Sequence, residues 1–254
     1  MSRPLTVRTV VLQHSQGCGS LPVQSHWTSH GTGQDPARLA TVTVRRSANA
    51  SSAPHRPDPA VTRAVFAVLG EAGLDPADAR RRVGRIALET VDAEAENQLI
   101  AQRAALIAAD SWPRRPLLIP AVDAESGEPT VWDATAGVPL VRAVAASSTF
   151  PGIEPPVTVD GRRYLDGALR AGTNTDLAAD PRTVVVVDPL AHHHPHPTPD
   201  GAHILAPDPA AVRLIDAEQS DPETWKTAYQ AGRTQARAAA EELRAHWRPA
   251  SAQG

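Results

Sequence analysis

Residues 143–177, AVAASSTFPGIEPPVTVDGRRYLDGALRAGTNTDL, decide how the rest of this sequence is interpreted. The stretch contains the end of an apolar helix, then a proline-rich bend, then a hairpin with an Asp-Gly turn, which is the strongest short-range hairpin signal. Asp166 ends the second strand of that hairpin and begins the tripeptide Asp166-Gly167-Ala168. In folds that mix strands and helices, functional groups collect where strands end in loops. Asp166 is therefore the first candidate for chemistry, although Asp and Gly are also the ordinary residues of turns.

The segment before this stretch has the periodicity of helices. Asp58-Pro59 and Asp75-Pro76 each place a capping acid before a proline at the first helical position. A third helix is predicted over residues 92–109. Its inward face is expected to carry the apolar residues Leu99, Ile100, Ala104, Ile107 and Ala108. Its charged residues are expected to lie on a solvated face: Glu94, Glu96 and Arg103.

Short apolar runs predict strands on both sides of the bend. Residues 117–122 and 130–133 are predicted to form two strands, and residues 157–159 and 162–165 form the hairpin. Residues 183–187 are apolar on both faces, so we expect them in the middle of a parallel sheet. Because strands and helices alternate along the chain, the predicted fold class is α/β.

Residues 1–57 differ in composition from the rest of the chain. Asp35 is their only acid, and Ser, Thr, Gln, Gly and His fill much of the segment without a period. Strands are conceivable at residues 7–12 and 41–44, but the roughly thirty structureless residues between them count against a compact domain. We expect residues 1–57 to be an irregular segment, either disordered or outside the native reading frame. Residues 58–254 are expected to form the folded part.

Composition and charge exclude several classes of protein. No apolar run approaches the ~20 residues of a membrane span, and no secretory h-region is visible, so we expect no integral membrane segment and a cytoplasmic location. Cys18 is the only cysteine, which excludes an internal disulfide and a cysteine-based zinc site. The net charge is −3 and the basic residues of the first segment are scattered apart from Arg45-Arg46, so no nucleic-acid partner is expected. The sequence leaves the oligomeric state open.

A group of histidines is the one candidate metal site. His192, His193, His194 and His196 stand in a proline-rich loop, and imidazole is a common metal ligand. No acid or cysteine stands at a recognisable ligand spacing, and prolines interrupt the group. We therefore interpret it as loop composition and expect neither a metal nor a cofactor.

Several blocks of the sequence resemble bacterial patatin-like phospholipases. The resemblance extends over roughly residues 58–247, and the Asp-Gly-Ala block is fairly specific in this context. The blocks that carry it are Trp132-Asp133, residues 137–148, Phe150-Pro151-Gly152, Pro155-Pro156-Val157, residues 161–168, 174–178 and 184–189, the segment from Asp221-Pro222 to Trp225, and Ala231-Gly232-Arg233.

This resemblance implies a three-layer α/β/α sandwich that hydrolyses the acyl esters of lipids through a Ser–Asp dyad. In such a dyad the serine attacks the ester carbonyl, and the aspartate takes the serine proton directly, without a histidine. By match to the family motif, Asp166 is the implied proton acceptor. Residues 58–254 are then the C-terminal part of a patatin-like domain, and the implied partner is a lipid or small ester substrate.

The sequence departs from the family in the elements that should carry the nucleophile. It contains neither the Gly-x-Ser-x-Gly elbow that holds the serine nor a Gly-x-Gly-x-x-Gly loop for the oxyanion. The nearest approach is Ser15 in Gln13-His14-Ser15-Gln16-Gly17, where glutamine stands in place of the first glycine and no helix follows. We expect the domain to lack its first strand, oxyanion loop and elbow. Two hypotheses follow: an acyl hydrolase with impaired activity, or an inert remnant that serves at most as an interaction module.

Overall fold

The structure is a computed structural model of the 254-residue chain, and it describes residues 9–10, 58–107, 109–178, 184–192, 200–215 and 222–246. The chain divides into two compact units, Met1–Ala178 and Ala179–Gly254. Strand β1 (Thr9–Val10) lies within the first predicted strand of the N-terminal segment. The second predicted strand, at residues 41–44, falls outside the described residues.

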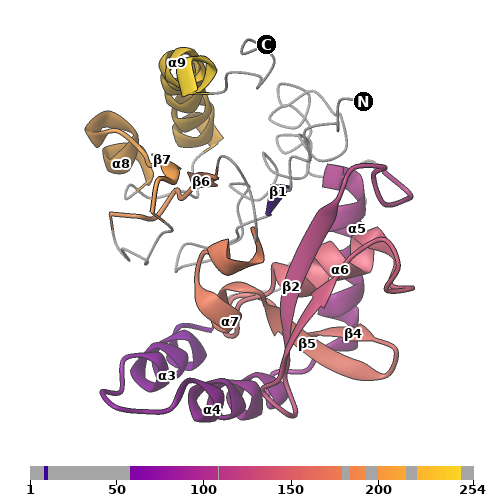
Figure 1. The fold of residues 1–254 in the computed structure, drawn as a ribbon. Coiled ribbons are helices and arrows are strands. Elements are labelled where there is room, and N and C mark those ends of the chain that lie inside the picture. The colour runs from indigo at the N-terminus through magenta and orange to yellow at the C-terminus, as the bar shows by residue number, and fades with distance from the viewer. Residues whose placement is uncertain are drawn as a thin grey trace. The chain divides into compact units, whose positions relative to one another are not determined.

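The first unit is a mixed sheet with helices on both faces (Figure 1). Its strands run in the order β1-β2-β5-β4, and β3 also pairs with β2. β2 is parallel to β1 and antiparallel to β3 and β5. The further elements of the unit are α3 (Pro59–Leu69), α4 (Pro76–Leu88), α5 (Ala93–Ile107), β2 (Leu117–Asp123), β3 (Pro129–Trp132), α6 (Leu140–Ser147), β4 (Val157–Val159), β5 (Arg162–Asp166), α7 (Ala168–Ala171) and the 3₁₀ turn η1 (Thr175–Leu177).

The predicted helix starts are confirmed by their caps. The Asp58 carboxylate accepts the Ala60 backbone N–H at 2.8 Å, and the Asp75 carboxylate accepts that of Ala77 at 2.9 Å. In both helices proline occupies the first turn, where a backbone N–H has no intrahelical acceptor, so the N–H that proline lacks costs no hydrogen bond. The hairpin is also confirmed: Asp160 and Gly161 have φ angles of 48° and 78°, the left-handed pair that a tight β-turn requires.

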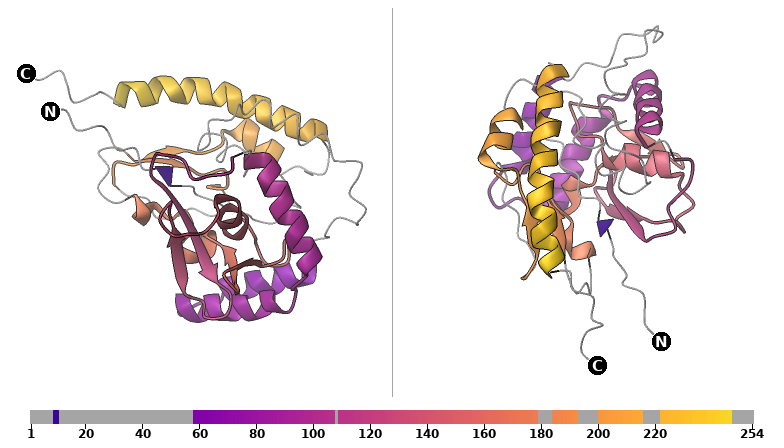
Figure 2. Two further views of the ribbon diagram at one scale, coloured as in Figure 1. Left: turned by 90° about the vertical axis from the view of Figure 1, so that its right-hand side faces the viewer. Right: turned by 90° about the horizontal axis from the view of Figure 1, so that it is seen from above.

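Two apolar clusters show that helices cover both faces of this sheet. Tyr164 packs against the cluster that α5 and α6 form with β2, whereas Leu165 belongs to the cluster with α3 and α4. Because successive side chains of a strand point to opposite faces, these neighbours place the two clusters on opposite sides of β5. Helices α3 and α4 lie side by side (Figures 1 and 2). The predicted α/β class is confirmed.

Two charged residues of α5 are not on a solvated face, so that prediction is wrong for them. Arg103 is buried and Ala104, expected inside, is exposed, because Leu99, Arg103 and Ile107 are spaced by four residues and share the inward face. Glu96 is half-buried, and its carboxylate accepts two hydrogen bonds from Thr158: one from the backbone N–H at 2.8 Å and one from the side-chain hydroxyl at 3.0 Å. Glu94 is exposed, as expected.

The same contacts close one edge of the sheet. β4 is the terminal strand of the described sheet, so the N–H and C=O of Thr158 that point away from β5 would otherwise be open to another strand. Glu96 accepts that N–H, and Arg142 of α6 donates to that carbonyl at 2.8 Å. Side chains from two helices therefore satisfy the backbone of this edge strand.

The second unit contains a separate small sheet. Its elements are β6 (Val185–Val187), β7 (His203–Leu205), α8 (Pro209–Ile215) and α9 (Pro222–His246). β6 pairs in parallel with β7 alone among the described strands, so the prediction that residues 183–187 occupy the middle of a larger sheet is wrong. Within β6 Val186 is buried, whereas Val185 and Val187, which point to the opposite face, are partly exposed. Figure 2 shows α9 as one uninterrupted helix. None of the helices in the described parts of the chain is long and apolar enough to cross a bilayer.

Gly84 provides a test of how α4 packs on the sheet. A Cβ at this position would lie 2.0 Å from the Ala124 carbonyl oxygen. We expect Gly84→Ala to lower the free energy of unfolding by ~1–3 kcal/mol, as overpacking does, although alanine is favoured over glycine in an exposed helix by about 1 kcal/mol. Urea unfolding measures the change.

Gly232→Ala is the matched control, because Gly232 is also helical but a Cβ added there would meet no atom within 4 Å. Equal effects of the two substitutions would contradict the close packing of α4 on Ala124.

Candidate active site

Asp166 is fixed at the end of β5 by the neighbouring strand β2, by Thr149 between α6 and β4, and by the turn that follows. It pairs with Ala121 of β2, and the residue is completely buried. Its backbone N–H donates to the Thr149 carbonyl at 2.9 Å. Its carboxylate Oδ1 accepts the Ala168 N–H at 2.8 Å, in the first turn of α7. The carboxylate therefore has a defined orientation at a strand end, as the sequence predicted for its position.

Gly167 is required by a close approach of two backbones. Its N–H donates to the Ser147 carbonyl at 3.2 Å, at the end of α6. On its other side, a Cβ would lie 2.3 Å from the carbonyl oxygen of Pro120 in β2. No side chain fits between these segments, so the glycine of the tripeptide allows Asp166 to sit against the central strand.

Asn174 closes the loop after Asp166. It is completely buried and has a φ of 52°, a left-handed conformation that asparagine tolerates better than most residues. Its Nδ2 donates to the carbonyls of Gly167 and Gly172, each at 3.0 Å. Arg170 donates to the Asn174 side-chain oxygen at 3.0 Å. The amide thus ties the residue next to Asp166 to the far end of the loop.

Arg170 also forms a two-point ion pair on this loop. Its guanidinium donates to the two carboxylate oxygens of Asp176 at 2.9 and 2.6 Å. These hydrogen bonds hold the pKa of the Asp176 carboxyl below its ordinary value and raise the pKa of Arg170. The pair lies at the partly exposed side of the loop, with Asp176 more than half accessible.

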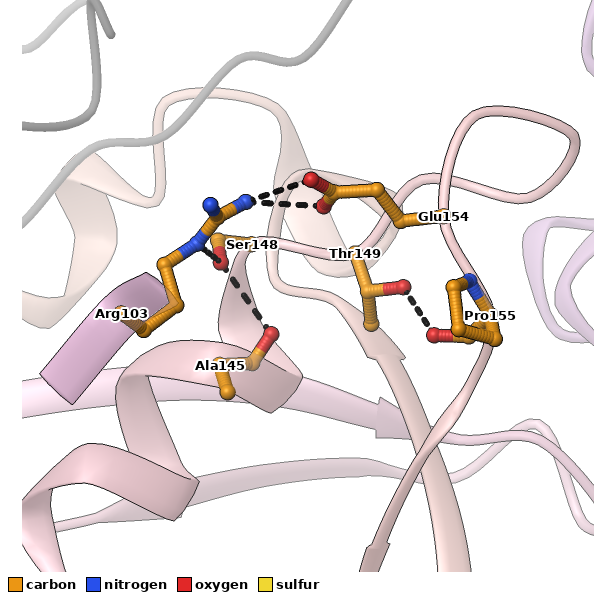
Figure 3. Close-up of polar contacts among 6 residues, drawn as sticks. All are labelled: Arg103, Ala145, Ser148, Thr149, Glu154 and Pro155. Carbon is orange, nitrogen blue, oxygen red and sulfur yellow. Dashed lines mark hydrogen bonds and ion pairs between the residues drawn. The ribbon is translucent and has the colours of Figure 1, made fainter. Parts of the chain in front are cut away.

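A buried charge cluster lies beside the same loop (Figure 3). The Arg103 guanidinium donates to both oxygens of Glu154, at 2.7 and 2.8 Å, and its Nε donates to the Ser148 hydroxyl at 2.9 Å. Ser148 in turn donates to the Ala145 carbonyl at 3.1 Å. This cluster was not predicted from the sequence, although the four-residue spacing of Arg103 from Leu99 and Ile107 could have indicated it.

The serines that contact this region from α6 and its end are inaccessible. Ser147 is 1% exposed and its hydroxyl has no hydrogen-bond partner, and Ser148 is fully buried. A nucleophile must reach a substrate carbonyl, so neither serine is presented for attack. Ser15, the one serine that the sequence offered as a nucleophile, falls outside the described residues.

The described residues bring together no donor set for a metal. Within the ranges that the structure covers, no three His, Cys, Asp or Glu side chains gather as a metal ion would need. Of the histidine group only His192 is described, and His193, His194 and His196 fall outside those ranges. What the site presents for chemistry is one oriented, buried carboxylate.

Substitutions at Asn174 test what holds this loop. Asn174→Asp removes the donor to two buried carbonyls, and each unsatisfied group costs roughly 1–3 kcal/mol. We expect the free energy of unfolding to fall in urea titrations by at least that amount. Asn174→Gly keeps the left-handed backbone at no steric cost but also lacks the donor, so it should destabilise as well. A glycine variant as stable as the parent would show that only the backbone angle matters.

The pH dependence of stability tests the Arg170–Asp176 pair. Because the pKa of Asp176 is lower in the folded state than its ordinary value of 3.8, the pair stabilises the fold fully above that value. This contribution is lost as pH falls through the lower, folded pKa. The difference in urea midpoint between parent and Asp176→Asn should be constant near neutral pH and shrink in acid below 3.8. In an Arg170→Met background the difference should be much smaller at every pH, because only the backbone hydrogen bonds to the Asp176 carboxylate then remain, and an undiminished difference would contradict the pairing.

Comparison with known proteins identifies the family. The sequence pattern of the family described as "Patatin-like phospholipase" matches residues 33–179, which is more than half of the 254 residues. The match contains the whole Asp166 loop and begins before residue 58, the predicted start of the folded part. No curated protein matches the chain at a significant level. On the family match, this chain belongs to the patatin-like phospholipases, a family of lipid acyl hydrolases.

Proposed function

We propose that this protein is a carboxylic ester hydrolase of the lipid acyl type in which Asp166 is the proton acceptor of a Ser–Asp dyad. The observation that supports this role is the position of Asp166 at a strand end, with its carboxylate oriented by the Ala168 N–H. The family match, which covers this loop, supports the substrate class: a lipid or small ester.

The proposed reaction needs only the serine and this carboxylate. The serine oxygen attacks the ester carbonyl while Asp166 takes the hydroxyl proton, and the tetrahedral intermediate expels the alcohol, which receives that proton from Asp166. Water then attacks the acyl-serine, gives its proton to Asp166 and releases the fatty acid; the proton returns to the serine. No cofactor takes part in these steps.

The sequence does not contain the motif that normally carries the nucleophilic serine of this reaction. No Gly-x-Ser-x-Gly occurs in the 254 residues, and Ser15 has glutamine at the position of the first glycine. We propose that activity is impaired for this reason, with Ser15 as the candidate nucleophile. The second candidate function, an inert relative that acts as an interaction module, is favoured by the joint lack of the elbow and of a Gly-x-Gly-x-x-Gly loop. The cytoplasmic location and the division at residue 58 stay predictions.

Labelling of the full chain with a fluorophosphonate separates the two functions. Such probes react with an activated serine, so the hydrolase should acquire a label that peptide mapping assigns to one serine. Asp166→Asn removes the proton acceptor and is expected to lower the labelling rate by at least ~10²-fold, the usual size of a general-base contribution.

Asp160→Asn is the matched control, because it makes the same chemical change in the exposed hairpin turn, where asparagine is equally suitable. A label that persists in Asp166→Asn would overturn the role of Asp166. The absence of any label in folded protein would favour the inert alternative.

A further inference from the structure

The guanidinium of Arg103 contacts a single segment at two separated points. This segment, residues 148–156, joins α6 to β4 and is called the α6–β4 linker below. Arg103 reaches it from α5 and donates to Ser148 at its start and to Glu154 near its end (Figure 3). The side chains of Arg103 and Glu154 are only 9% and 11% exposed, so the ion pair is largely removed from water.

The linker is also the backbone partner of Asp166. Thr149, the residue after Ser148, accepts the Asp166 N–H at 2.9 Å through its carbonyl. The Thr149 hydroxyl donates to the Pro155 carbonyl at 2.5 Å, next to Glu154. Both contacts of Arg103 are therefore close to Thr149. Ser148 is the residue before Thr149, and Glu154 is the residue before Pro155, whose carbonyl accepts the Thr149 hydroxyl.

Other contacts hold the linker without orienting Thr149. Phe150 stacks on Phe66 of α3 at a centroid distance of 5.4 Å, and the Gly152 carbonyl accepts the Asp58 N–H at 2.6 Å. Apolar stacking is adaptable in direction, whereas Arg103 binds through two different nitrogens: Nη2 donates to both Glu154 oxygens and Nε donates to the Ser148 hydroxyl, so the planar guanidinium sets the distance between the two ends of the linker. Among these contacts, those of Arg103 are the ones that join the start of the linker to its end through one side chain from another element.

Stability alone is a poor explanation for this cluster. Charges taken out of water lose their hydration, and apolar residues of similar volume often replace a buried ion pair without loss of stability. An apolar pair would fill the same space but would leave the orientation of the linker unspecified.

We propose that Arg103 is a positioning residue that, through Ser148 and Glu154, holds the linker so that the Thr149 carbonyl fixes the backbone of Asp166. The chemical value of this placement rests on the proposed function, in which Asp166 is the proton acceptor. The placement itself is a property of the fold and can be measured without turnover.

The test uses Arg103→Met/Glu154→Leu in the full chain. The double substitution removes both charges together, so no unpaired charge is left buried. Amide hydrogen exchange, followed by NMR, is measured at Asp166, whose N–H binds Thr149, and at Ala124, whose N–H binds the Arg163 carbonyl at 2.8 Å. We expect exchange at Asp166 to rise by about tenfold or more through local opening, and exchange at Ala124 to stay unchanged.

Two results would overturn the proposal. One is that the Asp166 amide exchanges at the same rate in the double variant as in the parent. The other is that the exchange rates of Asp166 and Ala124 rise by the same factor, because a purely structural role loosens the unit as a whole. If the double variant does not fold, Glu154→Gln replaces it. That variant keeps the shape of the side chain but removes one acceptor of the bidentate pair, and Asp166 should again exchange faster than Ala124. An unchanged ratio in Glu154→Gln would then overturn the proposal.

The hydrogen-exchange result tests the role of Arg103 whether or not the proposed function is correct. If no serine reacts with the fluorophosphonate, the hydrolase assignment falls, while the exchange result still decides the role of Arg103. If a serine does react, the double variant should also label more slowly than the parent at equal thermal stability.

Discussion

The hydrogen bond from the Asp166 N–H to the Thr149 carbonyl joins the two segments on which the candidate active site depends. On one side is the end of β5, placed by its pairing with β2. On the other is the linker after α6, held by α3 and by the Arg103 cluster. Because Gly167 has no side chain, the backbone after β5 lies directly against Pro120. This backbone contact fixes the position of the neighbouring Asp166 carboxylate. The remaining features of the site, including the Asn174 amide, fix the exit of the chain from this contact.

Charged side chains of the helices in this unit bind groups of neighbouring segments whose hydrogen bonds must point in a set direction. Glu96 and Arg142 bind the open backbone groups of Thr158, and Arg103 binds the two ends of the linker. In each case a helix side chain completes hydrogen bonds of an irregular or terminal segment that cannot complete them itself. A buried backbone group without a partner is costly, which explains the positions of Glu96 and Arg142 beside Thr158. Arg103 instead binds two side chains, the Ser148 hydroxyl and the Glu154 carboxylate.

The family assignment and the chemical assignment have different support. The match over residues 33–179 identifies a patatin-like phospholipase, and the Asp166 loop is complete within it. The proposed dyad also needs a presented serine, and the sequence lacks the Gly-x-Ser-x-Gly motif of the strand-to-helix turn that presents one in this reaction. The order of the Asp166 carboxylate can therefore be measured by hydrogen exchange of its backbone, separately from the question of a nucleophile.

The sequence by itself determined the local elements: the capped starts of α3 and α4, the Asp160-Gly161 hairpin, the position of Asp166 at a strand end and the α/β class. These follow from contacts within a few residues, which the order of amino acids specifies directly. Only the tertiary structure decided that Arg103 and Glu96 are inside, that β6 belongs to a two-stranded sheet, and that Thr149 receives the Asp166 N–H. Those outcomes depend on partners that are distant in the chain, such as Glu154 for Arg103, and helix periodicity alone places a charged residue in water unless such a partner is known.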